Sequence, residues 1–267
     1  MQEQSKFVRH KLPCPSCGGS DPVSMNEDKS AHCFSCETHF PNYVDACDGK
    51  IVDTTPKPKV TTSFLNSYTG SFGPLTDRDI SEETAKKYSV RRIVSSTNQI
   101  SQHIYPFFNG NEVVGTKTRF IENKNFAFSG TYEGTGLFGE QLFRNTGGKY
   151  LTITEGEIDC MSLAEVFNGK WATVSLRNGA QSVVKSLKDS FEFVDSFEKI
   201  VLAFDNDEAG KEAIDKALEI FSPDKVKIMS YPDGYKDVSD MLQAGLVREL
   251  ENCWWRAKTY MPSDIVG

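Results

Sequence analysis

The sequence lacks the long hydrophobic runs of membrane proteins and the repeats of solenoids. A membrane-spanning helix needs roughly 20 apolar residues, and no run of about 18 or more occurs in this chain of 267 residues. The first twenty residues have no apolar core of the kind a signal peptide requires, which argues against Sec-type export. Low-complexity tracts and repeats of fixed period are absent from the sequence as well. These absences predict a cytoplasmic protein without a membrane partner.

The composition is that of a folded globular protein, with 38% hydrophobic and 25% charged residues. Its net charge of −7 is unevenly distributed. Residues 1–60 carry 7 basic and 8 acidic side chains, residues 61–150 carry 10 and 8, and residues 151–267 carry 13 and 21. A broadly acidic surface repels phosphates, whereas a few carboxylates around divalent cations recruit them. The positions of the acids therefore matter more than their sum.

Four of the seven cysteines form the pattern C-x2-C-x15-C-x2-C, with ligands Cys14, Cys17, Cys33 and Cys36. Each pair can direct two sulfurs at one ion, and two pairs complete a tetrahedral zinc site. The clustering and the odd total favour metal binding in a reducing compartment over a disulfide framework. So small a module cannot bury enough core to fold alone, so we expect one structural Zn2+ to stabilise it. Two redox or packing pairs are the alternative.

The sequence predicts an α/β protein with several parts. A zinc-binding ribbon domain is expected over residues 1–47, followed by a proline-containing linker over 48–63. Residues 64–149 mix a short helix, capped by Ser81, with short strands separated by glycine-rich turns, which indicates an α+β subdomain. This subdomain is expected to precede a separate α/β part of the chain.

Residues 150–250 show a cleaner period and are predicted to form an α/β subdomain, with 251–267 as a C-terminal segment. Short apolar runs alternate there with helix-like segments, which predicts a parallel sheet. The runs are 150–154, 171–176, 199–204 and 225–231, and the predicted helices are 157–167, 180–189 and 208–221.

Acidic side chains follow the predicted strands at the point where each strand ends. Glu155 follows the first run directly, Asp205 and Asp207 follow the third, and Asp237 lies in the loop after the fourth. Asp159 comes back to the same edge if a helix opens after Glu155. The carboxyl ends of parallel strands form the ligand-binding edge of such sheets, and carboxylates crowded there predict a Mg2+ site. For any one acid, a helix-start residue is the alternative.

Four phrases in this order, TEGEID, SLRNGA, FDNDEAG and KDVSD, resemble the TOPRIM domain of bacterial-type primases and topoisomerases. Together with the four-cysteine ribbon, the whole chain resembles the primase half of T7-like phage primase-helicases, in the DnaG-type primase superfamily. The likeness runs from Cys14 to the closing residues 261–267, which resemble the start of a linker to a helicase domain. No G-x4-G-K-[ST] motif occurs, so the chain is expected to be the primase part of a longer parent.

The resemblance implies a nucleotidyltransferase that makes short RNA primers from ribonucleoside triphosphates on a single-stranded DNA template. In a two-metal phosphoryl transfer, Glu155, Asp205 and Asp207 would hold two Mg2+ or Mn2+ ions, supported by Asp159 and Asp237. Glu155 acting as general base is the alternative, and the sequence does not separate the two roles. Implied partners are the template, the primer, a replicative helicase in the same parent chain and a DNA polymerase.

Lys117, Arg119 and Lys124 resemble the phosphate-handling stretch of the family. Strand alternation places Lys117 and Arg119 on one face, where both can meet a triphosphate or the template backbone. An extra residue before Lys124, compared with the family, weakens its assignment. Asn178 follows the second strand and is expected to approach the nucleotide, and the ribbon is implied to read the template signal. A solvated strand face is the alternative for the basic residues.

Two other function classes fit the same parts. One is a non-catalytic zinc and TOPRIM scaffold of the recombination-mediator type, which tends to lose the acidic residues that this chain keeps. The other is a TOPRIM nuclease; a type IA topoisomerase would need a much longer, gated chain. Incubation with single-stranded DNA, Mg2+ and labelled ribonucleotides separates these classes by product.

Overall fold

The computed structural model describes residues 7–17, 22–44, 68–145 and 147–260. The chain divides into two compact units, residues 1–59 and residues 60–267. The predicted linker and the closing residues lie outside the described ranges. Within those ranges no helix is long and apolar enough to cross a membrane.

The first unit contains a four-stranded antiparallel sheet in the order β1-β2-β3-β4. Its apolar core is small and consists of four side chains, Val23, Ala31, Phe40 and Tyr43, together with Cys14 and Cys33. The strands are β1 (Phe7–Leu12), β2 (Val23–Asn26), β3 (Ala31–Cys33) and β4 (His39–Phe40).

The second unit begins with the helix α3 (Glu82–Lys87), which is the helix predicted after Ser81. Ser81 Oγ accepts a hydrogen bond from the backbone N–H of Thr84 at 3.2 Å, which caps the helix. An antiparallel sheet follows in the order β5-β6-β7-β8. Its strands are β5 (Arg91–Val94), β6 (Ile100–Asn109), β7 (Glu112–Phe120) and β8 (Phe126–Gly130). The apolar segments HIYPFF, EVVGTKTRF and NFAF predict the last three of these strands, whereas no such segment was recognised for β5.

The rest of the second unit is built on a five-stranded sheet in the order β10-β9-β11-β12-β13. The predicted parallel sheet is confirmed, since the first four of these strands run parallel to one another. The edge strand β13 is antiparallel and was missed, because two exposed residues carry no readable alternation. The strands are β9 (Gly148–Thr154), β10 (Ala172–Ser175), β11 (Phe197–Ala203), β12 (Val226–Ile228) and β13 (Lys258–Thr259).

Helices cover both faces of this sheet. Along β11, Ile200 and Leu202 belong to one apolar core, and Val201 and Ala203 belong to another, as the two-residue period of a strand dictates. The first core also takes side chains from α5 and α7, and the second from α4, α8 and α9. The helices are α4 (Glu157–Val166), α5 (Val183–Asp189), α6 (Phe191–Asp195), α7 (Glu208–Leu218), α8 (Val238–Gln243) and α9 (Val247–Trp255).

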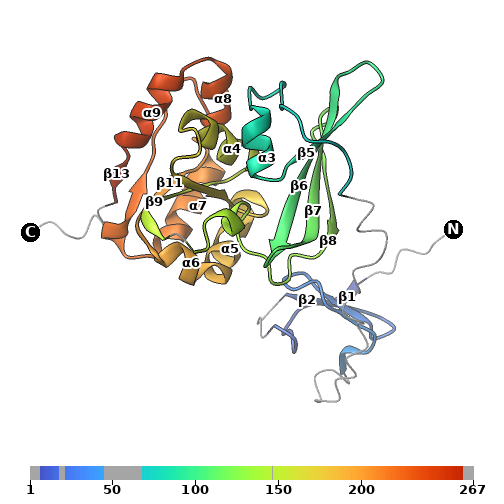
Figure 1. Cartoon of the computed structure of the whole chain (residues 1–267). Helices are drawn as coiled ribbons and strands as arrows, with labels where there is room; N and C mark the ends of the chain where they lie inside the picture. The colour runs from blue at the N-terminus through green and yellow to red at the C-terminus, as the bar shows by residue number, and fades with distance from the viewer. Residues whose placement is uncertain (1–6, 18–21, 45–67, 146, 261–267) are drawn as a thin grey trace, which may run out of the picture. The chain divides into compact units, whose positions relative to one another are not determined.

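Helix α4 joins the two sheets of the second unit (Figure 1). Leu163 packs in the core shared with β11, whereas Ile158 and Met161 pack in a third core with Tyr105 and Phe107 of β6. A helix that buries apolar residues on two sides lies inside the protein rather than on its surface. The start of α4 is therefore held in place by the cores of both sheets, and this is where the acidic residues gather.

Candidate active site and metal centre

Glu155 and Asp205 meet because the strands that precede them are neighbours. Thr154 at the end of β9 pairs with Ala203 of β11. Just beyond, Glu155 Oε1 accepts a hydrogen bond from the backbone N–H of Asp205 at 3.0 Å. The first turn of α7 packs directly against this pair, because a Cβ on Gly210 would lie 2.1 Å from the Asp205 carbonyl oxygen. Only glycine permits that approach.

Asp207 and Asp237 are N-caps of helices as well as members of the acidic cluster. Asp207 Oδ1 accepts from the backbone N–H of Gly210 at 2.9 Å at the start of α7. Asp237 Oδ1 accepts from the N–H of Asp240 at 2.8 Å at the start of α8. Capping uses one oxygen of each carboxylate and leaves the other for a further ligand. The helix-start role and the metal-binding role are therefore compatible.

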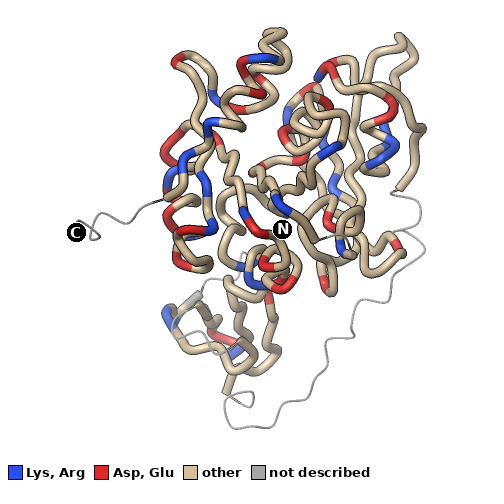
Figure 2. The backbone as a smooth tube through the Cα atoms, turned by 60° about the vertical axis from the view of Figure 1, so that its left-hand side comes forward, with Lys and Arg blue, Asp and Glu red and all other residues tan. Residues whose placement is uncertain are grey.

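Asp159 is partly buried in α4 and accepts a hydrogen bond from the N–H of Ser239 at 3.0 Å. Burial, followed by the charges of Asp237 and Asp205, raises its pKa well above the ordinary value. Burial and the charge of Asp205 likewise raise the pKa of Glu155. Acidic and basic residues are otherwise interspersed along the chain (Figure 2). This crowding of like charge is a local feature that bound cations would relieve.

Lys236 is a member of the site that sequence reasoning missed. Its Nζ lies 2.9 Å from Asp205 Oδ2 and 3.1 Å from Asp207 Oδ2. Hydrogen bonds to these two carboxylates raise the pKa of Lys236. The Gly210 N–H, followed by Lys236, lowers the pKa of Asp207. In the sequence, Lys236 is the first residue of KDVSD, in the loop after β12. No spacing rule predicts that a lysine of this loop will contact two carboxylates that follow a different strand, β11.

The basic side of the site comes from β7. Lys117 Nζ contacts Glu157 Oε1 at 2.9 Å and the carbonyl oxygen of Arg177 at 3.3 Å. Arg119 lies two residues along the same strand. The predicted shared face is observed, since both side chains line one cavity of about 400 Å3. The carboxylates that line this cavity belong to Glu155, Glu157, Asp159 and Asp205.

The two remaining predicted nucleotide-binding residues are placed differently. Asn178 lines the same cavity, and its Oδ1 accepts a hydrogen bond from the Tyr132 hydroxyl at 2.9 Å. Lys124 does not line the cavity. It is exposed in the turn between β7 and β8, with a φ of 58°. The local backbone of that turn, which the sequence does not reveal, decides where its side chain points.

The residues at the carboxylate cluster fit hydrated divalent cations. Glu155, Asp205 and Asp207 offer only oxygen ligands, as Mg2+ prefers, and Mg2+ usually keeps several waters. The buried Tyr231 hydroxyl has no hydrogen-bond partner among the described residues. Burial, followed by the charges of Asp159 and Asp205, raises its pKa. A buried hydroxyl beside carboxylates is suited to contact a metal-bound water.

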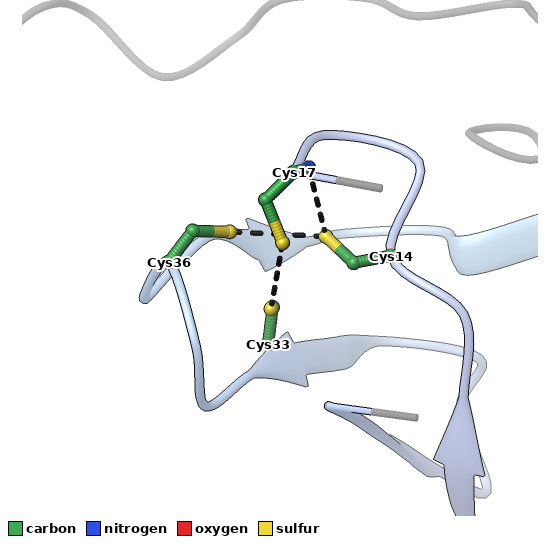
Figure 3. Close-up of side chains that lie close together, drawn as sticks. All are labelled: Cys14, Cys17, Cys33 and Cys36. Carbon is green, nitrogen blue, oxygen red and sulfur yellow. Dashed lines mark hydrogen bonds between the residues drawn. The ribbon is translucent and has the colours of Figure 1, made fainter. Parts of the chain in front are cut away.

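The four cysteines of the first unit converge on one centre, and their sulfurs point toward one another (Figure 3). Cys14 Sγ lies 3.7 Å from Cys36 Sγ, and Cys17 Sγ lies 3.9 Å from Cys33 Sγ. A tetrahedral zinc ion with bonds of about 2.3 Å places its sulfurs about 3.8 Å apart. All four ligand atoms lie within 4.8 Å of one another. The predicted ligand set therefore has the dimensions of a closed zinc site.

Comparisons with known proteins support this description. A family model described as Toprim-like matches residues 152–242. The DNA helicase/primase of Enterobacteria phage T3 is 30% identical over 276 residues, which cover 100% of this chain and 46% of that protein. The chain thus spans about half the length of this curated relative.

Solved structures of primases are also similar. The crystal structure of the primase fragment of the Bacteriophage T7 primase-helicase is 31% identical with a TM-score of 0.65, covering 94% of this chain and 100% of the fragment. The primase domains in a structure with the T7 lagging-strand DNA polymerase, an RNA/DNA hybrid and dTTP are 32% identical with a TM-score of 0.64, covering 72% and 94%. The zinc-binding and RNA polymerase domains of the Aquifex aeolicus primase share the fold, with 15% identity, a TM-score of 0.52, and coverage of 89% and 75%.

Proposed function

The chain belongs to the family of T7-like phage primase-helicases, of which it represents the primase part, and we propose that it makes short RNA primers on single-stranded DNA. The observation that carries this proposal is the hydrogen bond from the Asp205 N–H to Glu155 Oε1 at 3.0 Å. It brings carboxylates from two strands together in one cavity with the cationic side chains of Lys117 and Arg119. A primase needs carboxylates and cationic side chains side by side. The carboxylates hold the metal ions, and the cationic side chains bind the triphosphate.

Within this proposal, Glu155, Asp205 and Asp207 hold two Mg2+ or Mn2+ ions. When bound, such ions lower the pKa of an attacking 3′-hydroxyl and neutralise a triphosphate and its leaving pyrophosphate. Asp159 and Asp237 support the site by keeping its backbone frame in place through Ser239 and Asp240. The raised pKa of Glu155 also suits a proton acceptor, so the role of general base stays the alternative for this residue.

The basic residues orient the nucleotide. Lys117 is held by Glu157, so its ammonium group is fixed before a substrate arrives. Arg119 has no carboxylate partner among the described residues, and its buried Nε has no hydrogen-bond partner there. A guanidinium without a protein anion is available for a phosphate. Asn178 lines both this cavity and a neighbouring one, which supports its proposed contact with the nucleotide.

The zinc ribbon contributes to recognition of the template signal in this proposal. A helicase domain in the same parent chain and a DNA polymerase are its proposed protein partners, and the host cytoplasm is its proposed location. The T3 relative is a helicase/primase, and one similar T7 structure contains the lagging-strand DNA polymerase together with two primase domains. These features support the assignments, which concern the parent protein rather than the described residues.

The test is an incubation of the chain with single-stranded DNA, Mg2+ and labelled ribonucleoside triphosphates. Template-dependent oligoribonucleotides are the expected product. Nicked DNA in place of oligoribonucleotides would identify a nuclease, and the absence of both would identify a scaffold. A library of templates scored in the same assay would also reveal the recognition sequence that the ribbon reads.

A further inference from the structure

Phe126 is an exposed aromatic residue in the cavity that also holds proposed metal ligands and the basic side chains. It begins the edge strand β8, and 53% of its surface is exposed. It lines the same cavity as Glu155, Asp205 and Lys117. It belongs to none of the apolar cores of the described residues. An aromatic ring that packs in no core and faces a ligand cavity marks a binding surface.

The ring of Phe126 lies beside the two cations that we assign to phosphate. Phe126 pairs with Arg119 across the β7–β8 ladder. Lys117 Nζ lies 4.7 Å from the ring centroid and Arg119 Cζ lies 5.8 Å from it. These cation–π contacts hold the ring next to the charged groups. A nucleotide whose phosphates contact Lys117 or Arg119 therefore has an aromatic surface within reach of its base.

We infer that Phe126 is a stacking surface for a nucleobase bound in the catalytic cavity. The inference rests on the proposed function and names the residue that orients the base. Stacking on an aromatic ring tolerates all four bases, because each has a π-face. This tolerance suits an enzyme that must read many templates. The base belongs either to the incoming ribonucleotide or to the template strand, and the two sources are separable by experiment.

Phe128 provides a matched control on the same strand. It faces the same side of the sheet as Phe126 and is 40% exposed. Its ring, however, stacks on Tyr132 with centroids 3.9 Å apart and leans over Gly115, where a Cβ would lie 2.8 Å from it. It does not line the catalytic cavity. Replacing Phe128 therefore removes an exposed aromatic side chain from β8 without removing the proposed stacking surface.

The experiment compares Phe126→Ala, Phe126→Trp and Phe128→Ala with the wild-type chain, after circular dichroism confirms that each is folded. Fluorescence anisotropy measures the binding of a labelled single strand without nucleotides. Primer synthesis measures kcat and KM for each ribonucleoside triphosphate. Losing one base stack costs about 5- to 150-fold in binding. We expect Phe126→Ala to lose about that much, Phe126→Trp to restore it, and Phe128→Ala to stay near wild type.

The two measurements locate the base. A raised KM with unchanged DNA binding assigns the ring to the incoming nucleotide, and weakened DNA binding assigns it to the template; either result supports the stacking role. Phe126→Ala within about two-fold of wild type in both measurements overturns it, as does an equal loss in Phe128→Ala. Wild-type chain that makes no primer overturns the proposed function instead, and the anisotropy measurement still tests Phe126 against DNA.

Discussion

The four-cysteine cluster and the carboxylate cluster differ in how closely their ligand atoms are spaced. The sulfurs come from turns and strand ends of a small module and lie within 4.8 Å of one another. Among the residues that the structure describes, no three carboxylates bring oxygens this close together. Their wider spacing, with Lys236 between Asp205 and Asp207, suits ions that retain water.

The two clusters also differ in what holds their ligands. The carboxylates of Glu155, Asp159, Asp207 and Asp237 each accept a hydrogen bond from a backbone N–H. Those N–H groups lie at a strand end and at helix starts that two apolar cores support. Among the described residues of the first unit, the thiols are supported by one small core. The acidic site is therefore shaped before its metal binds, whereas we expect the ribbon to depend on its metal for folding.

Removing the zinc is the most direct test of this difference between the two clusters. Chelation, or the substitution Cys33→Ser, should unfold residues 7–44, because structural zinc contributes on the order of 10 kcal/mol or more to such modules. Hydrogen exchange should then show lost protection in β1–β4 and unchanged protection in β9 and β11. Retained protection of β2 and β3 in the metal-free chain would show that the module folds without zinc, and the proposed contrast between the two clusters would be wrong.

Glu155→Gln tests the acidic cluster. Primer synthesis should fall by about 10²- to 10⁴-fold, because a group that holds a metal ion or accepts a proton is lost. The fold should persist, since the amide oxygen of glutamine can still accept from the Asp205 N–H. Thermal unfolding without metal should therefore stay within a few degrees of wild type. The control is Glu208→Gln, an exposed position next to Asp207, which should leave synthesis unchanged; near-normal synthesis by Glu155→Gln would remove this residue from the reaction.

Lys236 tests the same difference, because its ammonium group lies between two proposed metal ligands, Asp205 and Asp207. Lys236→Met should bind Mn2+ a few-fold more tightly, since a partly exposed ion pair contributes about 1 kcal/mol or less and no longer competes with the metal. Titration calorimetry or the electron paramagnetic resonance of free Mn2+ measures this affinity. Lys211→Met, an exposed lysine of α7, is the matched control. Weaker Mn2+ binding by Lys236→Met would instead mean that the lysine helps to orient Asp205 and Asp207.

Lys236 also marks the limit of what could be predicted from the sequence. The meeting of Glu155 with Asp205 was predictable, because parallel strands bring their carboxyl ends to one edge of a sheet. The zinc ligands were predictable, because their spacing is local. The positions of Lys236 and Lys124 depend on loop backbones, and the exposure of Phe126 depends on β8 being an edge strand. No short-range pattern encodes these features, since they arise from tertiary packing.

The smallest expected effect concerns pH. An acid whose pKa is raised in the folded state binds its proton more readily when folded than when unfolded. Its ionisation therefore lowers the free energy of unfolding. This loss is absent below the ordinary aspartate pKa of about 3.9 and increases as the pH rises from there through the raised pKa. Asp159→Asn cannot ionise. In chelator at neutral pH, it should unfold about 2–4 °C above wild type for each kcal/mol of relieved repulsion, and this difference should vanish near pH 4.

Bound metal should cancel the same effect, because divalent cations neutralise the charges that raise the pKa of Asp159. Scanning calorimetry of wild type and Asp159→Asn, from pH 4 to neutrality with and without Mg2+, measures both differences. Asp215→Asn on the exposed side of α7 is the control and should follow wild type throughout. If Asp159→Asn is no more stable than wild type in chelator at neutral pH, the acidic cluster carries no net repulsion. Lys236 and the backbone N–H groups would then compensate the charge of the carboxylates without a metal ion. The two clusters would differ only in whether their surroundings need a metal ion to fold.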